Sequence, residues 1–250
     1  YIKGSNDVTT YDLASGQDLC NLEIVSQTPD ADVVVHMAAT NGTRLFYETP
    51  TEVAFNNTIP TFNLIQRYIN TNAKFVFTST CENVPVMFND IINPRWSYSI
   101  PKALGENLVA NSGLKWLVIR YFNIYGPRQK DHFISEFVER VAKGEYYIKG
   151  DDTRSFCYID DAVKLTHELI ENHDNQIINV GRQEENSISD VARIIMDIMG
   201  VDPAKLEVLP GLKGSAKRRC PDTSKLLLST GPFEYTPLKV GLKQTVESLL

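Results

Sequence analysis

The sequence of 250 residues contains no apolar run close to the ~18 residues that a membrane-spanning helix needs, so no membrane span is predicted. It also lacks a long basic run, and its net charge is −6. Both features argue against a nucleic acid or an acidic membrane as partner. No charged and apolar leader follows Tyr1, so a signal peptide is not expected.

Paired cysteines are missing as well. The four cysteines lie far apart without C-x-x-C spacing, at Cys20, Cys81, Cys157 and Cys220. Such spacing fits neither a zinc site nor a disulfide framework. We therefore expect reduced thiols, a cytoplasmic protein and no bound metal.

Short β-branched runs alternate with helical patterns in the first half of the chain. Strands are expected at residues 32–37, 74–79 and 114–120, and helices at 15–27, 50–70 and from about 97 to 111. The first strand, DVVVHM, is expected to be buried on both faces. This alternation predicts right-handed βαβ units and a doubly wound, Rossmann-like parallel sheet, with ligands at the carboxyl ends of its strands.

The pattern changes after Gly126. Helices are expected at 133–143, 160–171 and 187–199, the last with Ser187 or Ser189 as N-cap, and a strand is expected at 177–180. We therefore predict an α/β fold with a Rossmann-like domain over residues 1–126. A smaller mixed α/β lobe would cover residues 127–250, with some segments returning to the core sheet.

Tyr98 and Lys102 lie four residues apart, which places them on one face of a helix. An ammonium close to a phenol favours the phenolate, so Lys102 is expected to lower the pKa of Tyr98 and to make it a general base. Pro101 cannot donate to the carbonyl of Ser97. The helix is therefore expected to begin near Ser97 or Tyr98, with Pro101 in its first turn.

Seven motifs in this order resemble the extended short-chain dehydrogenases/reductases of the NAD-dependent nucleotide-sugar epimerase/dehydratase family. They are DVVVHMAA (32–39), FNNTIPTFNLI (55–65), FVFTSTCE (75–82), YSIPK (98–102), RYFNIYGPRQ (120–129), TRSFCYIDD (153–161) and INVGR (178–182). The resemblance covers almost the whole chain. It implies NAD as cofactor, a nucleotide-diphosphate sugar as substrate in the second lobe, and a homodimer formed through helices 50–70 and 97–111.

The resemblance also implies the site residues. Tyr98, Lys102 and Thr80 would be catalytic. The cofactor would contact Asp7, Val8, Met37, Ala38, Ala39, Thr40, Asn57, Thr78, Tyr98, Lys102 and Tyr121. The substrate would contact Thr80, Glu82, Asn123, Arg128, Arg154 and Arg219, because planar guanidinium groups suit a diphosphate. His36 is expected to be a structural strand histidine.

The family's Gly-rich turn, which holds the pyrophosphate at a helix N-terminus, is absent, and the chain begins about where the family's third strand is expected. The sheet is therefore expected to be incomplete at its N-terminal end. Related dehydratases and decarboxylases carry a carboxylate directly after the hydroxyl residue, where this chain has Cys81 and then Glu82. This favours a nucleotide-sugar 4-epimerase; a 4,6-dehydratase, a decarboxylase or a non-catalytic binding module remain alternatives.

Overall fold

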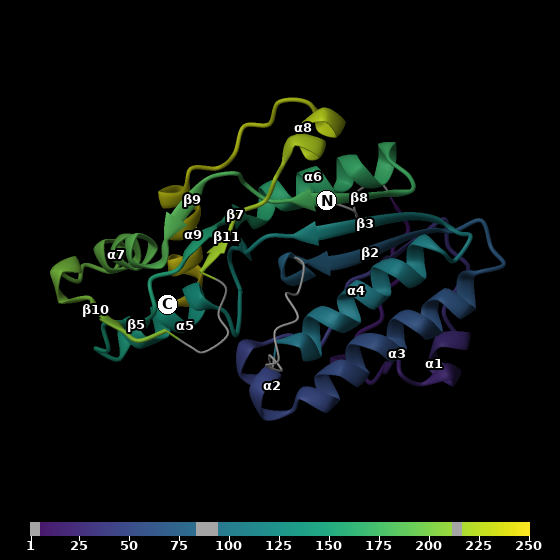
Figure 1. The fold of residues 1–250 in the computed structure, drawn as a ribbon, viewed down its shortest axis with the longest axis horizontal. Helices are drawn as coiled ribbons and strands as arrows, with labels where there is room; N and C mark the ends of the chain where they lie inside the picture. Colours follow the sequence, from purple (N-terminus) through teal and green to yellow (C-terminus); the bar gives the residue numbers. More distant parts are fainter. Residues whose placement is uncertain (1–5, 84–94, 212–216) are drawn as a thin grey trace. The chain divides into compact units, whose positions relative to one another are not determined.

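The computed structural model describes residues 6–83, 95–211 and 217–250 (Figure 1). The chain forms two compact units, one of residues 1–120 and 166–178 and the other of residues 121–165 and 179–250. Each unit therefore combines segments that are distant in sequence. Within the described ranges, no helix has both the length and the apolar character needed to cross a membrane.

A four-stranded sheet forms the centre of the first unit, and its last two strands continue across the division. The strands are β1 (Val33–His36), β2 (Lys74–Thr80), β3 (Lys115–Tyr121) and β8 (Gln176–Val180), in the order β1-β2-β3-β8. β1 and β2 run parallel, with Val33 opposite Lys74 and His36 opposite Phe77. The predicted α/β fold with a parallel sheet is confirmed.

Burial differs sharply between the first two strands. All seven residues of β2 are buried, as a strand covered on both faces should be. β1 is the outer strand of the described sheet; only His36 in it is buried, and Val33 is 39% exposed. The prediction that this strand is buried on both faces is therefore wrong, because its place in the strand order was not encoded in its own residues.

Two helices of the first unit, α3 (Pro50–Tyr68) and α4 (Trp96–Ala110), pack side by side, and α4 also packs against β2 (Figure 1). α3 begins with Pro50, whose fixed φ suits a first helical position. Two shorter helices, α1 (Leu22–Ser26) and α2 (Thr43–Glu48), accompany them. The helix predicted over 15–27 is mostly absent: a 3₁₀ turn, η2 (Leu13–Ser15), ends at Gly16 in a left-handed conformation.

Helix α4 begins earlier than predicted. The carbonyl of Arg95 accepts the amides of Tyr98 at 3.1 Å and Ser99 at 3.0 Å, so the helix already starts at Trp96. Pro101 consequently lies beyond the first turn. The prediction of Pro101 in the first turn is wrong, because the helix starts one to two residues earlier than expected. The bonding carbonyl upstream of Ser97 was not apparent from the sequence.

The second unit is a mixed α/β lobe of short strands and four helices, together with part of α6 (Ile159–Asn172). The helices are α5 (Phe133–Ala142), α7 (Ile188–Ile198), α8 (Ser224–Thr230) and α9 (Leu238–Leu249). The strands are β4 (Ile124–Tyr125), β5 (Tyr147–Lys149), β6 (Thr153–Ser155), β7 (Cys157–Tyr158), β9 (Glu185–Ser187), β10 (Glu207–Leu209) and β11 (Arg218–Arg219). They form the pairs β10-β5 and β4-β7 and the three-stranded sheet β11-β6-β9.

The core of this unit is formed by the apolar faces of α5, α7 and α9, with Phe137, Ile195 and Leu242 fully buried. α7 begins as predicted, because the Ser187 side chain accepts the amide of Asp190. Two 3₁₀ turns complete the described structure, η3 (Cys81–Asn83) in the first unit and η4 (Pro203–Lys205) in the second.

Candidate active site

The carboxyl end of β2 places Thr80 at the end of a fully buried strand. Thr80 itself is buried, and its Oγ1 accepts the backbone N–H of Glu82 at 3.2 Å from the turn η3. The Thr80 hydroxyl lies close enough to the Tyr98 phenol to lower the pKa of that phenol. Two of the three predicted catalytic side chains therefore meet at the position where parallel α/β sheets bind ligands.

Tyr98 lies in the first turn of α4 and is 8% exposed. Its ring stacks on that of Phe46 from α2, with centroids 5.0 Å apart and an interplanar angle of 18°. Phe46 and Val53 complete a small apolar cluster around the tyrosine. The phenol is therefore held rigidly in a dry environment, which strengthens every electrostatic interaction with it.

Lys102 lies one turn further along α4 and is 3% exposed. Its Nζ donates to the backbone carbonyl of Thr78 at 2.9 Å and lies 5.9 Å from the centroid of the Tyr98 ring. Burial lowers the pKa of Lys102 to about 8. The lysine is thus buried near the tyrosine as predicted, with its ammonium bonded to the strand end.

The pKa of Tyr98 is raised, not lowered. Burial contributes most, the neighbouring Cys81 and Glu82 add to it, and only the Thr80 hydroxyl acts in the opposite direction. The prediction that Lys102 lowers the pKa of Tyr98 is therefore wrong for this structure. Desolvation of the phenolate outweighs an ammonium that is bonded to the Thr78 carbonyl.

The residues predicted to hold NAD lie in the first unit, apart from Tyr121, which is half-buried at the end of β3. Met37, Ala38 and Ala39 are exposed directly after β1, with Thr40 half-buried behind them, so the backbone there is accessible. Asp7 is exposed and Val8 is half-buried. These residues offer a carboxylate acceptor and an open, small-residue backbone, as a dinucleotide requires.

Buried polar groups also fit the cofactor. Asn57 donates to the carbonyls of Thr40 at 2.9 Å and Val53 at 2.8 Å, while its buried Oδ1 has no hydrogen-bond partner within residues 6–83, 95–211 and 217–250. The bond of Lys102 to Thr78 uses one of three ammonium donors. Thr78 in turn donates to the His36 carbonyl at 3.0 Å. The Asn57 acceptor and the remaining Lys102 donors are groups of the kind that bind the hydroxyl groups of a ribose.

His36 connects β1 to α3. Its Nε2 lies 2.9 Å from Thr61 Oγ1, and burial followed by the charge of Lys102 lowers its pKa to about 3. Its Nδ1 is buried without a partner among the described residues. The histidine is therefore neutral and structural, as predicted, although only one of its two ring nitrogens is hydrogen-bonded.

The predicted substrate residues other than Thr80 and Glu82 lie in the second unit. Arg154 of β6 and Arg219 of β11 are opposite each other in neighbouring parallel strands, and Arg154 is buried. Arg154 donates to its neighbours, the Thr153 carbonyl at 2.7 Å and Asp152 Oδ2 at 3.3 Å. Because residues at matching positions of neighbouring strands project to one face, both arginine side chains leave this sheet on the same face.

Asn123 and Arg128 both have positive φ angles, 42° and 66°. Asn123 tolerates this conformation well, and its Nδ2 donates to the Ser155 carbonyl at 2.8 Å. Arg128 is exposed. Asn123 is thus fixed next to the strand that carries Arg154, whereas Arg128 projects into solvent.

Three features of the first unit were not found in the sequence. Phe46 stacks on Tyr98, Arg95 forms an ion pair with Glu82 at 2.8 Å, and Glu106 connects Ser79 at 2.6 Å with Arg120, whose Nε lies 2.8 Å from it. All depend on side chains that are distant in sequence. The one available signal was the position of Glu106, one helical turn after Lys102.

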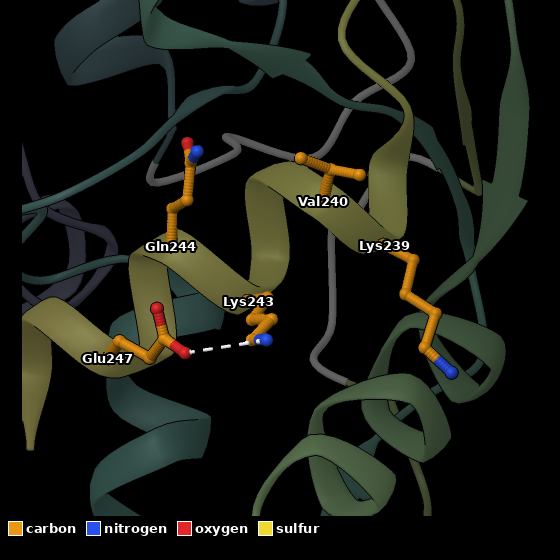
Figure 2. A pocket seen from close by; sticks show the side chains of 5 residues that line it. All are labelled: Lys239, Val240, Lys243, Gln244 and Glu247. Carbon is orange, nitrogen blue, oxygen red and sulfur yellow. Dashed lines mark ion pairs between the residues drawn. The ribbon is translucent and has the colours of Figure 1, made fainter.

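Surface hollows elsewhere lack such convergence. The hollow in Figure 2, about 420 Å³, is lined only by residues of α9, where Lys243 forms an ion pair with Glu247 at 3.8 Å. Lys239 forms an ion pair with Asp197 at 3.0 Å. Among the residues that the structure describes, no group of three or more His, Cys, Asp or Glu side chains could hold a metal ion.

A parallel α/β sheet with Thr80 at the end of β2, and Tyr98 and Lys102 on the helix α4 packed against that strand, defines the class as a short-chain dehydrogenase/reductase. The model of the NAD dependent epimerase/dehydratase family matches residues 5–181. The chain belongs to this family of NAD-dependent nucleotide-sugar enzymes.

Individual relatives agree with this assignment. The UDP-N-acetyl-alpha-D-glucosaminuronate decarboxylase of Bacillus cytotoxicus is 32% identical, over 90% of this chain and 78% of its own length. UDP-glucuronic acid decarboxylase 1 of Xenopus tropicalis is 26% identical, over 87% of this chain but only 56% of its own. The crystal structure of a UDP-glucose 4-epimerase from Thermotoga maritima, with UDP-glucose, gives a TM-score of 0.81 at 28% identity, covering 93% of this chain and 82% of that one.

Proposed function

We propose that the protein is an NAD-dependent nucleotide-sugar 4-epimerase. The observation that carries this proposal is the convergence of Thr80, Tyr98 and Lys102 at the carboxyl end of β2. The similarity to a UDP-glucose 4-epimerase supports the reaction and favours UDP as the nucleotide. NAD, when bound, supplies the acceptor for the electron pair that leaves the oxidised sugar carbon.

The side chains of this chain would handle the proton. Tyr98 accepts the proton of the sugar C4 hydroxyl as that carbon becomes a ketone, and returns it when the carbon is reduced on its other face. Thr80 can both donate and accept, so its hydroxyl can hold the same sugar oxygen while it lies close to Tyr98. Lys102 supplies positive charge and ammonium donors beside the phenol.

The cofactor would be held by residues of the first unit. Asp7 and Val8 are proposed to contact the adenine, and Met37, Ala38, Ala39 and Thr40 the phosphate and ribose groups. Asn57, Thr78, Lys102 and Tyr121 would contact the remaining polar groups. The buried Oδ1 of Asn57, which has no partner among the described residues, supports this assignment, because a ligand hydroxyl would satisfy it.

The nucleotide diphosphate would be bound by Arg154 and Arg219, with Asn123 and Arg128 as further substrate contacts. The matched position of the two arginines in β6 and β11 supports a shared anionic ligand. A guanidinium group bonds two phosphate oxygens at once, which suits it to this role.

A decarboxylase of nucleotide-sugar acids is the second candidate. Glu82 lies one residue after the position where the sequence lacks a carboxylate, and its charge acts on Tyr98. Two of the relatives above are decarboxylases. Oxidation at C4 would precede loss of CO₂ from the C5 carboxylate, so the same three catalytic side chains serve either reaction. A 4,6-dehydratase would also begin with this oxidation.

Product analysis separates these candidates. The purified protein is incubated with NAD and, separately, with UDP-glucose, UDP-galactose and UDP-glucuronate, and products are identified by NMR and mass spectrometry. Interconversion of the two hexoses, or of the uronate with its C4 epimer, without change of mass supports the epimerase. Loss of CO₂ supports the decarboxylase and loss of water the dehydratase. Absence of both product and bound NAD would leave a non-catalytic binding module.

We also propose a homodimer formed through α3 and α4. Both helices carry large apolar side chains that are about half exposed, Phe55 and Phe62 on α3 and Ile100 and Leu104 on α4. These lie at helical spacing, so each pair forms a stripe. Sedimentation equilibrium should give a dimer, and Phe62→Glu together with Leu104→Glu should give a monomer; a monomeric parent protein would contradict this assembly.

A further inference from the structure

The ion pair between Glu82 and Arg95 is buried beside the reacting groups. Glu82 Oε1 lies 2.8 Å from Arg95 Nη1, and the two side chains are 13% and 11% exposed. A buried ion pair is a weak source of stability, because removing two charges from water costs about as much as their attraction returns. Because the pair contributes little to stability, its position beside the reacting groups indicates another role.

Each partner of the pair also contacts one of two catalytic residues, Thr80 or Tyr98. The backbone N–H of Glu82 donates to Thr80 Oγ1 at 3.2 Å. The backbone carbonyl of Arg95 accepts the N–H of Tyr98 at 3.1 Å and opens α4. Contacts thus lead from Thr80 through Glu82 and Arg95 to Tyr98, whose phenol lies close enough to Thr80 for that hydroxyl to lower its pKa.

These contacts constrain the direction of the Thr80 hydroxyl. Because Thr80 Oγ1 already accepts the Glu82 amide, its own O–H is left to donate in another direction, and it lowers the pKa of Tyr98 as a donor to the phenol would. Breaking the ion pair would release the turn η3 from the start of α4. The distance between the Thr80 and Tyr98 hydroxyl groups would then no longer be fixed. A misplacement of about 1 Å is enough to slow catalysis 100-fold.

The pair also balances charge around the phenol. Tyr98 is faced by Cys81 and Glu82 from the turn, by Thr80 from β2, by Lys102 from its own helix and by the neutral ring of Phe46 from α2. The Glu82 carboxylate raises the pKa of Tyr98. The Arg95 guanidinium beside it supplies a compensating positive charge.

We propose that Glu82 and Arg95 are a positioning pair that holds the Thr80 hydroxyl against the Tyr98 phenol. Neither residue has to touch the sugar for this role. The inference deepens the proposed function, on which it rests, because it assigns the control of the proton-transfer geometry to residues outside the Thr80, Tyr98 and Lys102 set.

The test uses Arg95→Met, Glu82→Gln, the double variant and the conservative Arg95→Lys in the full protein. For Arg95→Met we expect kcat to fall about 10- to 100-fold with KM nearly unchanged, and the acidic limb of the kcat–pH profile, where Tyr98 loses its proton, to move to higher pH. Glu82→Gln should move that limb to lower pH. The double variant should lie between them, and Arg95→Lys should recover part of kcat.

Crystal structures of the same variants give a readout that is independent of turnover. Arg95→Met should lengthen the distance from Thr80 Oγ1 to Tyr98 Oη by about 1 Å relative to the parent protein. Should the parent protein be inactive, this separation would still support the positioning role while the proposed function fails. An unchanged distance, or a kcat within twofold of the parent, would overturn the inference. Asp197→Asn, which removes the exposed ion pair with Lys239, is the matched control and should change neither quantity.

Discussion

Lys102 Nζ donates to the backbone carbonyl of Thr78 at 2.9 Å, so the charge of the predicted catalytic lysine is bonded to the end of β2. The second buried lysine of this unit, Lys74, is bonded differently. Its Nζ contacts the carbonyls of Ile170 and His173 and the Asp174 carboxylate, the last at 2.9 Å. Lys74 thus directs its ammonium donors to three partners within the fold, whereas Lys102 keeps ammonium donors that can bind a ligand.

The first prediction concerns these two lysines. The pKa of Lys102 is lowered from 10.5 to about 8, so at neutral pH the folded state holds a charge at a cost of about 3 kcal/mol. Lys102→Met should therefore raise the free energy of unfolding at pH 7 by about 1–3 kcal/mol while abolishing turnover. Lys74→Met should lower it, because it removes an ion pair and two carbonyl partners. Urea denaturation measures both, and destabilisation by Lys102→Met would contradict the prediction.

The pH dependence has a definite sign. The folded protein binds the Lys102 proton more weakly than the unfolded chain, so the unfolding free energy should rise as pH increases from about 8 to 10.5. In the Lys102→Met variant, this rise of the unfolding free energy with pH should be absent.

The second prediction concerns His36. Its pKa is lowered from 6.5 to about 3, so between these values the unfolded chain binds a proton that the folded protein does not. The unfolding free energy should therefore fall by about 1.4 kcal/mol per pH unit on acidification below pH 6.5 from this residue alone. Denaturation curves for His36→Gln should lack that component, and His167→Gln on α6 should retain it. Equal slopes in all three proteins would refute the assignment.

The third prediction concerns Tyr98. Tyr98→Phe removes the proton acceptor but keeps the ring that stacks on Phe46. Turnover should fall by at least about 100-fold, whereas the affinity for the nucleotide sugar, measured by calorimetry, should change less than about threefold. Retained turnover would remove the tyrosine from the mechanism.

The fourth prediction concerns the Ser79, Glu106 and Arg120 network. Glu106 accepts from Ser79 at 2.6 Å and from Arg120 Nε at 2.8 Å, and its side chain is 8% exposed. Glu106→Gln should cost about 2 kcal/mol, less than a fully buried pair would, because Arg120 is 32% exposed. Glu247→Gln on α9, which removes an exposed pair with Lys243, should stay within about 0.5 kcal/mol. Thermal or urea denaturation measures the change in the free energy of unfolding for both variants. Equal changes would show that the Ser79, Glu106 and Arg120 network does not stabilise the fold.

The sequence predicts much of this fold because periodicity is local. The runs that became β2 and β3, and the patterns of α3, α5 and α7, identify themselves within a few residues. The exposure of β1 could not be predicted, because it depends on which strands pair with it. The start of α4 depends in the same way on the Arg95 carbonyl, which no pattern marks.

In the candidate site too, local patterns predicted the residues, whereas properties that depend on distant contacts could not be predicted. The identity of Thr80, Tyr98 and Lys102 followed from the order of motifs, and the structure places all three at the end of β2 and the start of α4. The direction of the Tyr98 pKa was missed, because desolvation is a property of the packed site. The pairing of Glu82 with Arg95 could not be predicted, because twelve residues separate the two in the sequence and no local pattern joins them.

Gly105 determines how closely α4 approaches the sheet. A Cβ atom there would lie 2.5 Å from Cζ of Phe77, which is fully buried in β2. The helix that carries Tyr98 and Lys102 is therefore spaced from Thr78 and Thr80 by the absence of a side chain. A single added methyl group would move both residues away from the strand end. Gly105 therefore fixes the distance between the reacting side chains, although it takes no chemical part in the reaction.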